Sequence, residues 1–184
     1  MSAVLETVKV RPAVIPYYRE KENFPPDILN RLYRKLEGQE LLSELLHNRA
    51  MFEQDFCKFL TEDALTSIFL DIESRAYVGL AWLDNIEECE TLTKASASFC
   101  FFREYWNPSV TDSFGEIFLG HAFNILGLDC VYGITPKPNR LSRRYCTRMG
   151  FRYVATIPQF VSYHGQTVDG MVCVQTKTEF NSRS

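Results

Sequence analysis

The chain has 184 residues, of which 46% are hydrophobic and 14% are aromatic, so it suits one domain with a sizeable core rather than a disordered chain. The formal net charge is −3, which excludes a global basic field of the kind that drives nucleic-acid binding. No apolar run approaches the ~20 residues that span a bilayer, so we expect no membrane contact.

The N-terminal third predicts a strand followed by helices. Residues 4–18 are rich in Val, Ile and Tyr and predict a first strand. Residues 22–39 predict a helix, because two prolines punctuate its start and Gly38 is a natural stop. Residues 39–60 continue at helical spacing with an apolar stripe that predicts core packing. That stripe comprises Leu41, Leu42, Leu45, Leu46, Phe52, Phe56, Phe59 and Leu60.

The period of the pattern then changes from helical to extended. Short β-like runs at residues 64–72, 76–83 and 93–102 predict three consecutive strands. Between the last two runs lies an acidic cluster at residues 87–90. We interpret this cluster as a solvated turn between strands.

A helix and a strand follow the three-strand segment. Residues 113–128 predict the helix, and Ser113 with Glu116 has the spacing of a capping box at its start. Residues 130–135 predict the strand. The helix in this position carries an apolar stripe, so it should pack on the sheet.

A second helix and two strands complete the order. Asn139 is the expected cap of the helix in residues 136–150, and Gly150 is its expected stop. Residues 151–163 and 167–180 predict two strands across a turn. Three strands followed by a β-α-β-α-β segment predict an α/β fold, or α+β, with a mixed sheet and helices on both faces. We expect one domain over residues 1–184.

This order resembles the GNAT superfamily, the Gcn5-related N-acetyltransferases, and in particular its ribosomal-protein N-acetyltransferase-like branch. The stretch that carries the resemblance is "HAFNILGLDCVYGITPKPNRLSRRYCTRMGF". Asn139, Ser142, Gly150 and Phe151 match the spacing of that branch, and Asp169 matches the acid often found at the start of the last strand.

The resemblance implies both a detailed fold and an activity. The fold is a mostly antiparallel twisted sheet with a central parallel strand pair, in which the strands near residues 100 and 131 splay apart. The helical segment 20–60 would form the wall on the acceptor side. The activity is transfer of an acetyl group from acetyl-coenzyme A (acetyl-CoA) to a primary amine, either a protein N-terminus or a small molecule.

The loop that should hold the cofactor's pyrophosphate departs from the family pattern. Family members use a glycine-rich loop whose backbone N–H groups reach the phosphates at a helix N-terminus. Here "EYWNPSVTDSFGE" has no glycine before Gly115, Pro108 lacks a donor, and Asp112 and Glu116 add negative charge. Either coenzyme A is held differently or it is not held. The resemblance assigns cofactor binding to Phe102, Arg103, Ser109, Val110, Thr111, Ser113, Asn139 and Arg140.

The expected acid for the departing thiolate lies on the arginine-rich helix. Many family members place a Tyr seven residues after the Asn, and here that position is Cys146. Tyr145 sits one residue earlier, about 100° away around the helix. The ribosomal branch often relies on the position of Ser142. We therefore expect Ser142 or Cys146 to relay a proton, although Cys146 also reads as a small buried hydrophobe.

The expected base is less well marked. Glu104, His121 and Asp169 are the titratable groups nearest the expected cleft, and we take Glu104 as the candidate. Asn139 has two interpretations, as the helix cap and as a contact of the pantetheine arm. Trp106, in the same loop, either covers a pocket or packs as an edge aromatic.

The basic face of the helix in residues 136–150 is open to three interpretations. Arg140, Arg144 and Arg148 lie four residues apart and so share one face. They form a solvated face, a site for the 3′-phosphate of coenzyme A together with Lys137, or a contact for nucleic acid or an acidic protein. Nucleic acid is the least favoured of the three because the patch is small and the chain is acidic overall.

A second hypothesis keeps the fold but not the activity. In it the chain is a non-catalytic GNAT-fold binding or assembly protein, of a kind that phages also encode, that has lost coenzyme A binding. A homodimer, or a host or assembly partner, fits either hypothesis. The six cysteines form no C-x-x-C pair and lie near no histidine at metal-ligand spacing, so we expect no metal and reduced thiols in the cytoplasm.

Overall fold

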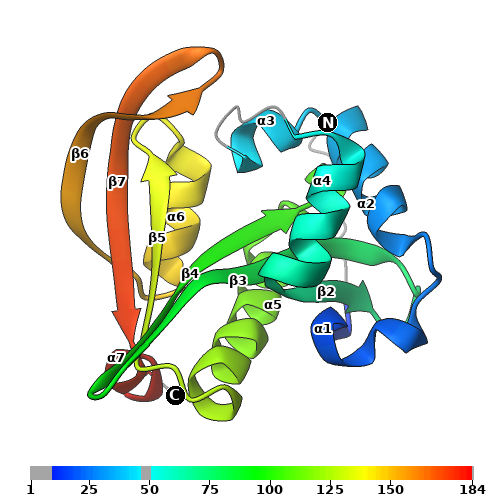
Figure 1. Cartoon of the computed structure of the whole chain (residues 1–184), viewed down its shortest axis with the longest axis horizontal. Coiled ribbons are helices and arrows are strands. Elements are labelled where there is room, and N and C mark those ends of the chain that lie inside the picture. The colour runs from blue at the N-terminus through cyan, green and yellow to red at the C-terminus, as the bar shows by residue number, and fades with distance from the viewer. Residues whose placement is uncertain (1–9, 47–50, 184) are drawn as a thin grey trace, which may run out of the picture.

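A seven-stranded sheet organises the chain in the computed structural model, which describes residues 10–46 and 51–183 (Figure 1). The strand order is β1-β2-β3-β4-β5-β7-β6. Every neighbouring pair is antiparallel except β4 and β5, which run parallel. The predicted mixed sheet with one central parallel pair is therefore confirmed. The strands are β1 Pro12–Pro16, β2 Leu65–Asp71, β3 Tyr77–Cys89, β4 Leu92–Phe101, β5 Cys130–Pro136, β6 Arg152–Tyr163 and β7 Gln166–Thr176.

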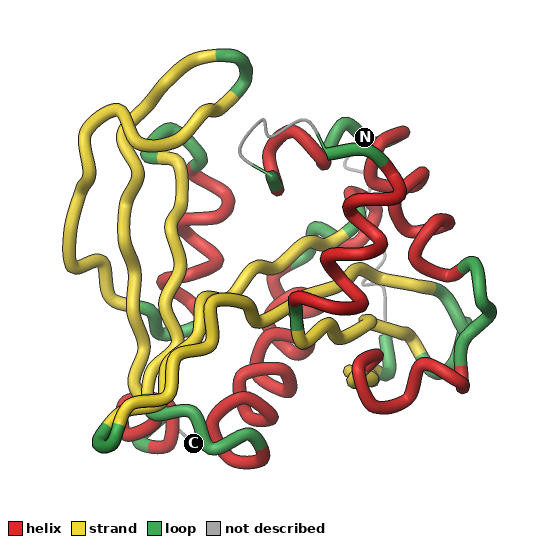
Figure 2. The backbone as a smooth tube through the Cα atoms, viewed as in Figure 1, coloured by secondary structure: helices red, strands yellow, loops and turns green. Residues whose placement is uncertain are grey.

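Helices cover both faces of the sheet (Figures 1 and 2). The helices are α1 Tyr17–Glu20, α2 Ile28–Gly38, α3 Leu42–Leu45, α4 Glu53–Lys58, α5 Pro108–Gly120, α6 Arg140–Arg148 and α7 Lys177–Asn181. Short 3-10 turns lie at Lys21–Asn23 and Arg103–Tyr105, and π-helical turns extend α4 over Phe59–Asp63 and α5 over His121–Ile125. None of the helices in the described ranges is long and apolar enough to cross a membrane.

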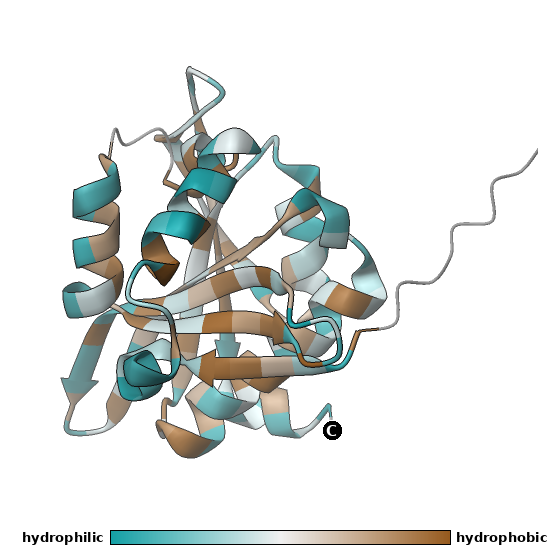
Figure 3. Ribbon diagram, turned by 90° about the vertical axis from the view of Figure 1, so that its right-hand side faces the viewer, coloured by the Kyte–Doolittle hydropathy of each residue, from teal (hydrophilic) through white to brown (hydrophobic). Residues whose placement is uncertain are grey.

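Two separate hydrophobic clusters lie on the two faces of the sheet. Because side chains alternate along a strand, Phe101 of β4 joins the cluster under α5, whereas Cys100 and Phe102 join the cluster under α2 to α4. In the first cluster Phe69 stacks on Phe114 with ring centroids 5.2 Å apart. Hydrophobic residues gather along the strands and on the helix faces that cover them (Figure 3). Both faces of β4 are thus anchored in core.

The parallel pair β4–β5 is short. The two strands pair only at Lys94–Ser96 against Cys130–Tyr132, three residue pairs in all. β5 continues to Pro136 in register with β7, while β4 continues to Phe101 in register with β3. Each strand therefore follows its antiparallel partner, and the two diverge beyond residue 96 as the resemblance implied.

The start of α5 differs from the prediction. The helix begins at Pro108, five residues before Ser113, and Asn107 is its cap, accepting a hydrogen bond from the backbone N–H of Ser109. Ser113 lies inside the helix, where its hydroxyl donates to the carbonyl of Val110 at 2.8 Å. Proline is favoured at the first position of a helix because its missing N–H would have no partner there. The predicted capping box at residues 113 and 116 is therefore wrong.

The expected helix over residues 39–60 is broken. The described residues form α3 and α4, and residues 47–50, like residues 4–9 of the expected first strand, lie outside the described ranges. Phe52 is 78% exposed, so its predicted place in the core is wrong. It precedes α4 as the N-cap residue, in an extended conformation, and so falls outside the apolar face.

Two further boundaries differ. β3 runs through the supposed acidic turn to Cys89, with a register shift at the left-handed Asn85, and Glu87 pairs with Lys94 of β4 across the hairpin. The chain after β7 turns into α7, because Thr176 and Glu179 form a capping box that the strand pattern concealed.

A close backbone contact in β3 yields a stability prediction. A Cβ on Gly79 would overlap the carbonyl oxygen of Cys100 and approach the Cα of Phe101, and neither is a flexible side-chain atom. Gly79→Ala should lower the free energy of unfolding by about 1–3 kcal/mol in urea titration. The matched control is Gly38→Ala, whose Cβ meets nothing within 4 Å. Equal stability of the two variants would contradict the described contact.

Candidate active site

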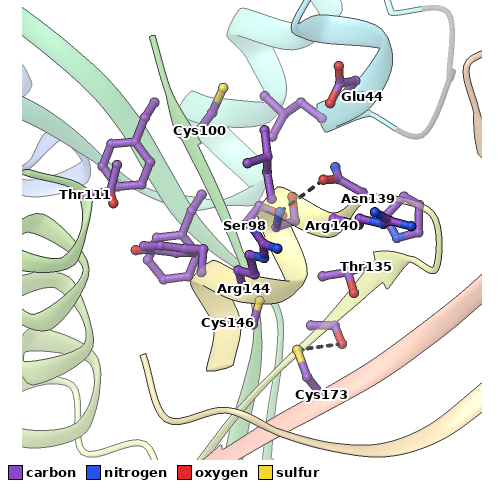
Figure 4. Close-up of a pocket in the computed structure, with 18 of the residues that line it drawn as sticks. Glu44, Ser98, Cys100, Thr111, Thr135, Asn139, Arg140, Arg144, Cys146 and Cys173 are labelled. Carbon is purple, nitrogen blue, oxygen red and sulfur yellow. Dashed lines mark hydrogen bonds between the residues drawn. The ribbon is translucent and has the colours of Figure 1, made fainter. Parts of the chain in front are cut away.

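A cavity of about 650 Å³ lies between the diverging halves of β4 and β5 (Figure 4). Its wall includes Leu41 and Cys100, which belong to the cluster under α2 to α4. It also includes Phe101 and Tyr145, which belong to the cluster under α5. The cavity therefore passes through the sheet from one face to the other, which only an unpaired stretch of two adjacent strands allows.

The register of β4 determines which of its backbone groups face this cavity. The N–H of Phe102 donates to the carbonyl of Val78 at 2.9 Å, which makes these two a hydrogen-bonded pair of the antiparallel ladder. Hydrogen-bonded and non-hydrogen-bonded pairs alternate along such a ladder. Ala97, Phe99 and Phe101 thus direct their N–H and C=O groups away from β3 and toward β5. Beyond the three residue pairs that β4 and β5 share, β5 offers no hydrogen-bond partner to these N–H and C=O groups. They therefore line the part of the cavity between the two strands, which we call the slot.

Trp106 borders the slot without filling it. Its indole N–H donates to the carbonyl of Phe101 at 2.8 Å, and the guanidinium of Arg103 lies 5.0 Å from the ring. The side chain is 42% exposed and forms part of the cavity wall. Of the two interpretations of Trp106, the structure supports the one in which it covers a pocket.

The backbone N–H groups at the N-terminus of α5 are already hydrogen-bonded to the residue that caps the helix. The Asn107 side chain accepts from the N–H of Ser109 at 3.0 Å. The backbone carbonyl of Asn107 accepts from the N–H groups of Val110 and Thr111 at 3.0 and 2.9 Å. Pro108 has no N–H to offer. The backbone donors that a phosphate would need at this helix end are therefore engaged or missing, and an anion in the cavity must find its partners elsewhere.

α6 supplies positive charge to the same cavity. Arg140, Arg144 and Arg148 all line it. Arg148 is held by Asp112 of α5 in a two-pronged ion pair, with Nε and Nη2 at 2.8 and 2.9 Å from the two carboxylate oxygens. Arg140 and Arg144 are exposed and have no carboxylate partner among the residues that the structure describes. Arg144 lies one turn before Arg148 on the same face of α6, and it lines the same cavity as Pro108 and Thr111 of the first turn of α5.

Asn139 caps α6 and borders the cavity at the same time. Its Oδ1 accepts from the N–H of Ser142 at 3.0 Å, and the residue is 8% exposed. The predicted cap is confirmed. Both Asn139 and Ser142 contribute to the cavity wall, and the cap leaves the amide Nδ2 as a donor.

The two neighbouring candidates on α6 have different surroundings. The Tyr145 hydroxyl is buried against Gly115 of α5 with no hydrogen-bond partner, and burial raises its pKa well above the ordinary value. Cys146 lines the cavity beside Cys173 and Tyr153. Contact with Cys173 lowers the pKa of the Cys146 thiol and raises the pKa of Cys173, whose Sγ donates to the carbonyl of Gly133. Both residues line the cavity, but their surroundings lower the pKa of Cys146 and raise that of Tyr145.

The candidate bases are engaged elsewhere. Glu104 lies 2.6 Å from the Lys35 ammonium and accepts from Gln39 at 2.8 Å. Although burial alone would raise the pKa of Glu104, these contacts hold it below its usual value. His121 bonds to a tyrosine hydroxyl at 2.8 Å, and Asp169 pairs with a lysine at 2.9 Å. None of the three borders the cavity.

The structure brings about half of the predicted site residues together. Those that line the cavity are Arg103, Thr111, Asn139, Arg140, Ser142 and Cys146. Those that do not are Phe102, Glu104, Ser109, Val110 and Ser113. Phe102 and Val110 are buried in the two hydrophobic clusters, which explains their absence from the wall.

Several lining residues were not predicted. Ser98 lines the cavity and lies two residues before Cys100 on β4, so the two share a face of the strand. This spacing is visible in the sequence. Glu44 and Tyr163 reach the cavity from α3 and β6, and nothing in their local sequence indicates it.

Comparison with known proteins adds structural neighbours but no sequence relatives. No protein-family model matches the sequence, and no curated protein matches it. Spermidine N-acetyltransferase from Vibrio cholerae, solved with CoA and spermine, has a TM-score of 0.75 at 11% identity, covering 92% of this chain and 98% of that chain. RimJ from Mycobacterium smegmatis, solved with CoA-disulfide, has a TM-score of 0.69 at 11% identity, covering 94% and 88%. A GNAT-family acetyltransferase from Bacillus anthracis has a TM-score of 0.70 at 12% identity, covering 92% and 98%.

These likenesses extend over nearly the whole chain. They show that it has the GNAT acetyltransferase fold, in agreement with the resemblance found in the sequence. The ribosomal-protein branch stays a prediction.

Asn139 both caps α6 and lines the cavity, and the cap yields a stability prediction. Asn139→Ala removes the cap acceptor and should lower the free energy of unfolding by about 1 kcal/mol, whereas Asn139→Asp keeps an acceptor and should stay close to the unsubstituted chain. Urea titration of the three proteins measures both. An Asp variant as unstable as the Ala variant would show that the side chain does more than cap.

Proposed function

We propose that this chain, which has the GNAT acetyltransferase fold, is an acetyl-CoA-dependent N-acetyltransferase acting on a primary amine of a protein or small molecule. The observation that carries the proposal is the three-pair parallel contact of β4 and β5, after which a cavity opens through the sheet. Such a passage lets a cofactor enter from one face and an acceptor from the other. The structural neighbours with CoA bound support the same conclusion.

The residues of the slot fit the arm of coenzyme A. The arm carries two amide groups, and the N–H and C=O groups of Phe99 and the N–H of Phe101 offer the ladder that β5 leaves unused. The Nδ2 group of Asn139 is a further donor at the wall. The slot is otherwise lined largely by apolar side chains, which suits a narrow and flexible chain.

The phosphates would be held by side chains rather than by a glycine-rich loop. Arg140 and Arg144 line the cavity without a carboxylate partner in the described ranges, and guanidinium groups bind phosphate in two-pronged fashion. Asp112 does not repel this anion, because its carboxylate is already paired with Arg148. The departure in the loop sequence is therefore matched by a different binding arrangement.

The chain's own groups can serve the transfer step. When bound, acetyl-CoA supplies a thioester whose carbonyl carbon the acceptor amine attacks. The N–H groups of Phe99 and Phe101 are fixed donors that stabilise negative charge on an oxygen in the slot. Cys146 and Ser142 are proton-bearing groups at the wall, and we propose that one of them gives its proton to the departing thiolate and recovers the proton that the neutral amine loses as it becomes an amide.

The non-catalytic alternative receives no support from the cavity, since a fold that had lost its cofactor would not need an open slot lined by unpaired arginines. We place the protein in the cytoplasm, where acetyl-CoA is made available and thiols stay reduced. Nucleic acid is not required to explain the basic face of α6. A homodimer, a host or assembly partner and a phage source stay predictions of the sequence.

Coenzyme A binding provides the first test. Free ligand at 100 times its dissociation constant should stabilise the chain by about 2.7 kcal/mol, seen as a rise in melting temperature. Arg144→Gln should weaken binding about tenfold or more, because it removes a charge-assisted contact to phosphate. Arg75→Gln, an exposed arginine of the β2–β3 turn, is the matched control and should change nothing. No thermal response of the unsubstituted chain up to millimolar coenzyme A would remove the transferase proposal.

A further inference from the structure

Four arginines and one carboxylate are the charged side chains among the described residues that line the cavity. One of the arginines, Arg103, donates from its backbone N–H and its Nε to Gln39, which precedes α3. The other three arginines, Arg140, Arg144 and Arg148, belong to α6, which packs against the cluster under α5. Glu44 of α3 is the one carboxylate among the described lining residues, and its neighbours Leu41 and Leu45 pack in the opposite cluster. Figure 4 shows Glu44 set apart from the Arg144 side chain. The three arginines of α6 and the carboxylate of α3 therefore lie at different parts of the cavity wall.

Most of the side chains around Glu44 in the cavity wall are apolar. The Glu44 side chain is only 21% exposed, and the walls around it include Leu41, Leu45, Cys100 and Tyr163. Burial, and then the Glu44 charge, raises the pKa of Cys100 to about 12, and the same two causes raise the pKa of Tyr163. The carboxylate thus acts on the groups across this part of the cavity, where a cation would be attracted strongly.

Among the residues that the structure describes, His164 is the one basic group paired with the Glu44 carboxylate. Oε1 of Glu44 lies 3.7 Å from Nε2 of His164, in the turn between β6 and β7, which is too long for a hydrogen bond. His164 is 59% exposed on its side chain, so the contact is open to solvent and to exchange. α3 and the β6–β7 turn therefore form a mouth at which the Glu44 carboxylate accepts no hydrogen bond from another described residue.

We propose that Glu44 binds the ammonium group of the acceptor at this mouth, and that the acceptor is a singly charged primary amine with an apolar body and no carboxylate beside the amine. The proposal rests on the transferase function above and names its substrate class. It also gives residues 20–60 the role of the acceptor-side wall, through Leu41, Glu44 and Leu45.

The charge pattern argues against two other classes of amine. A free amino acid carries a carboxylate on the carbon next to its amine, and that group would be placed beside Glu44 in a partly buried site, where like charges repel. A linear polyamine carries several positive charges, and a chain that extended through the passage would meet Arg140 and Arg144. One carboxylate among leucines suits one positive charge joined to an apolar group.

Two sources supply this chemistry, an arylalkylamine and the N-terminus of a peptide that begins with an apolar residue. In both, the amine lies next to an apolar group and no carboxylate is near. The peptide has an amide next to the carbon that bears the amine, and the arylalkylamine has none. The test compounds therefore include one with that amide and one without it.

Calorimetric titration tests the proposal with four probes, phenethylamine, L-phenylalaninamide, L-phenylalanine and spermidine, each with and without coenzyme A. We expect phenethylamine, L-phenylalaninamide or both to bind about tenfold or more tightly than phenylalanine and spermidine. Binding of both identifies the shared chemistry of a peptide terminus, and binding of phenethylamine alone identifies a small-molecule acceptor. Equal affinity for all four probes, or no binding of either amine, overturns the proposal.

Variants assign the effect to Glu44. Glu44→Gln keeps the shape and removes the charge, so it should weaken binding of the preferred amine about tenfold while coenzyme A affinity stays unchanged. Glu40→Gln removes a charge from an exposed position four residues earlier, outside the cavity wall, and should alter neither. Unchanged amine binding in Glu44→Gln overturns the proposal even if coenzyme A binds. Absence of coenzyme A binding in the unsubstituted chain would instead refute the transferase function. The titrations without coenzyme A would still test whether Glu44 binds the amine.

Discussion

The site depends on one constraint of strand pairing, namely that β4 follows β3 while β5 follows β7, so the two parallel neighbours share only three residue pairs. Beyond them, the backbone groups of β4 that would have bonded to β5 have no strand opposite. Buried backbone donors and acceptors without partners are costly, so such a stretch is stable only if water or a ligand completes it. The opening is thus a consequence of the sheet's register, and both faces of the fold contribute walls to it.

The way in which α6 is held explains the electrostatics of the cavity. Gly115 lets Tyr145 pack directly against α5, and the Arg148–Asp112 pair fixes the two helices one turn farther along. Arg144 lines the same cavity as Pro108 and Thr111 at the capped start of α5, where the backbone donors are already used. In the proposed arrangement, positive side chains take the place that a glycine-rich loop gives to N–H groups. Guanidinium groups are longer and more mobile than a backbone turn, and their attraction for phosphate is more strongly screened by salt.

Local sequence signals predicted the parts of this site that depend on local structure. Asn139 and Gly150 mark the two ends of α6 as expected, since capping and a left-handed stop are decided within a few residues. The start of α5 was misplaced because Ser113 and Glu116 imitate a capping box, while Asn107 before Pro108 is the signal that forms the cap. Glu44 could not be found in this way. Its place depends on the approach of α3 to the turn between β6 and β7, a contact between distant parts of the chain that no local pattern encodes.

Amide hydrogen exchange along β4, followed by nuclear magnetic resonance, tests the central claim most directly. In the free protein the amides of Phe99 and Phe101, which face the slot, should exchange faster than those of Ser98 and Cys100, which bond to β3. Saturation with coenzyme A should slow the first pair and leave the second pair unchanged. Equal protection of all four amides in the free protein, or slowing that does not distinguish the two pairs, would contradict a slot that receives the cofactor's arm.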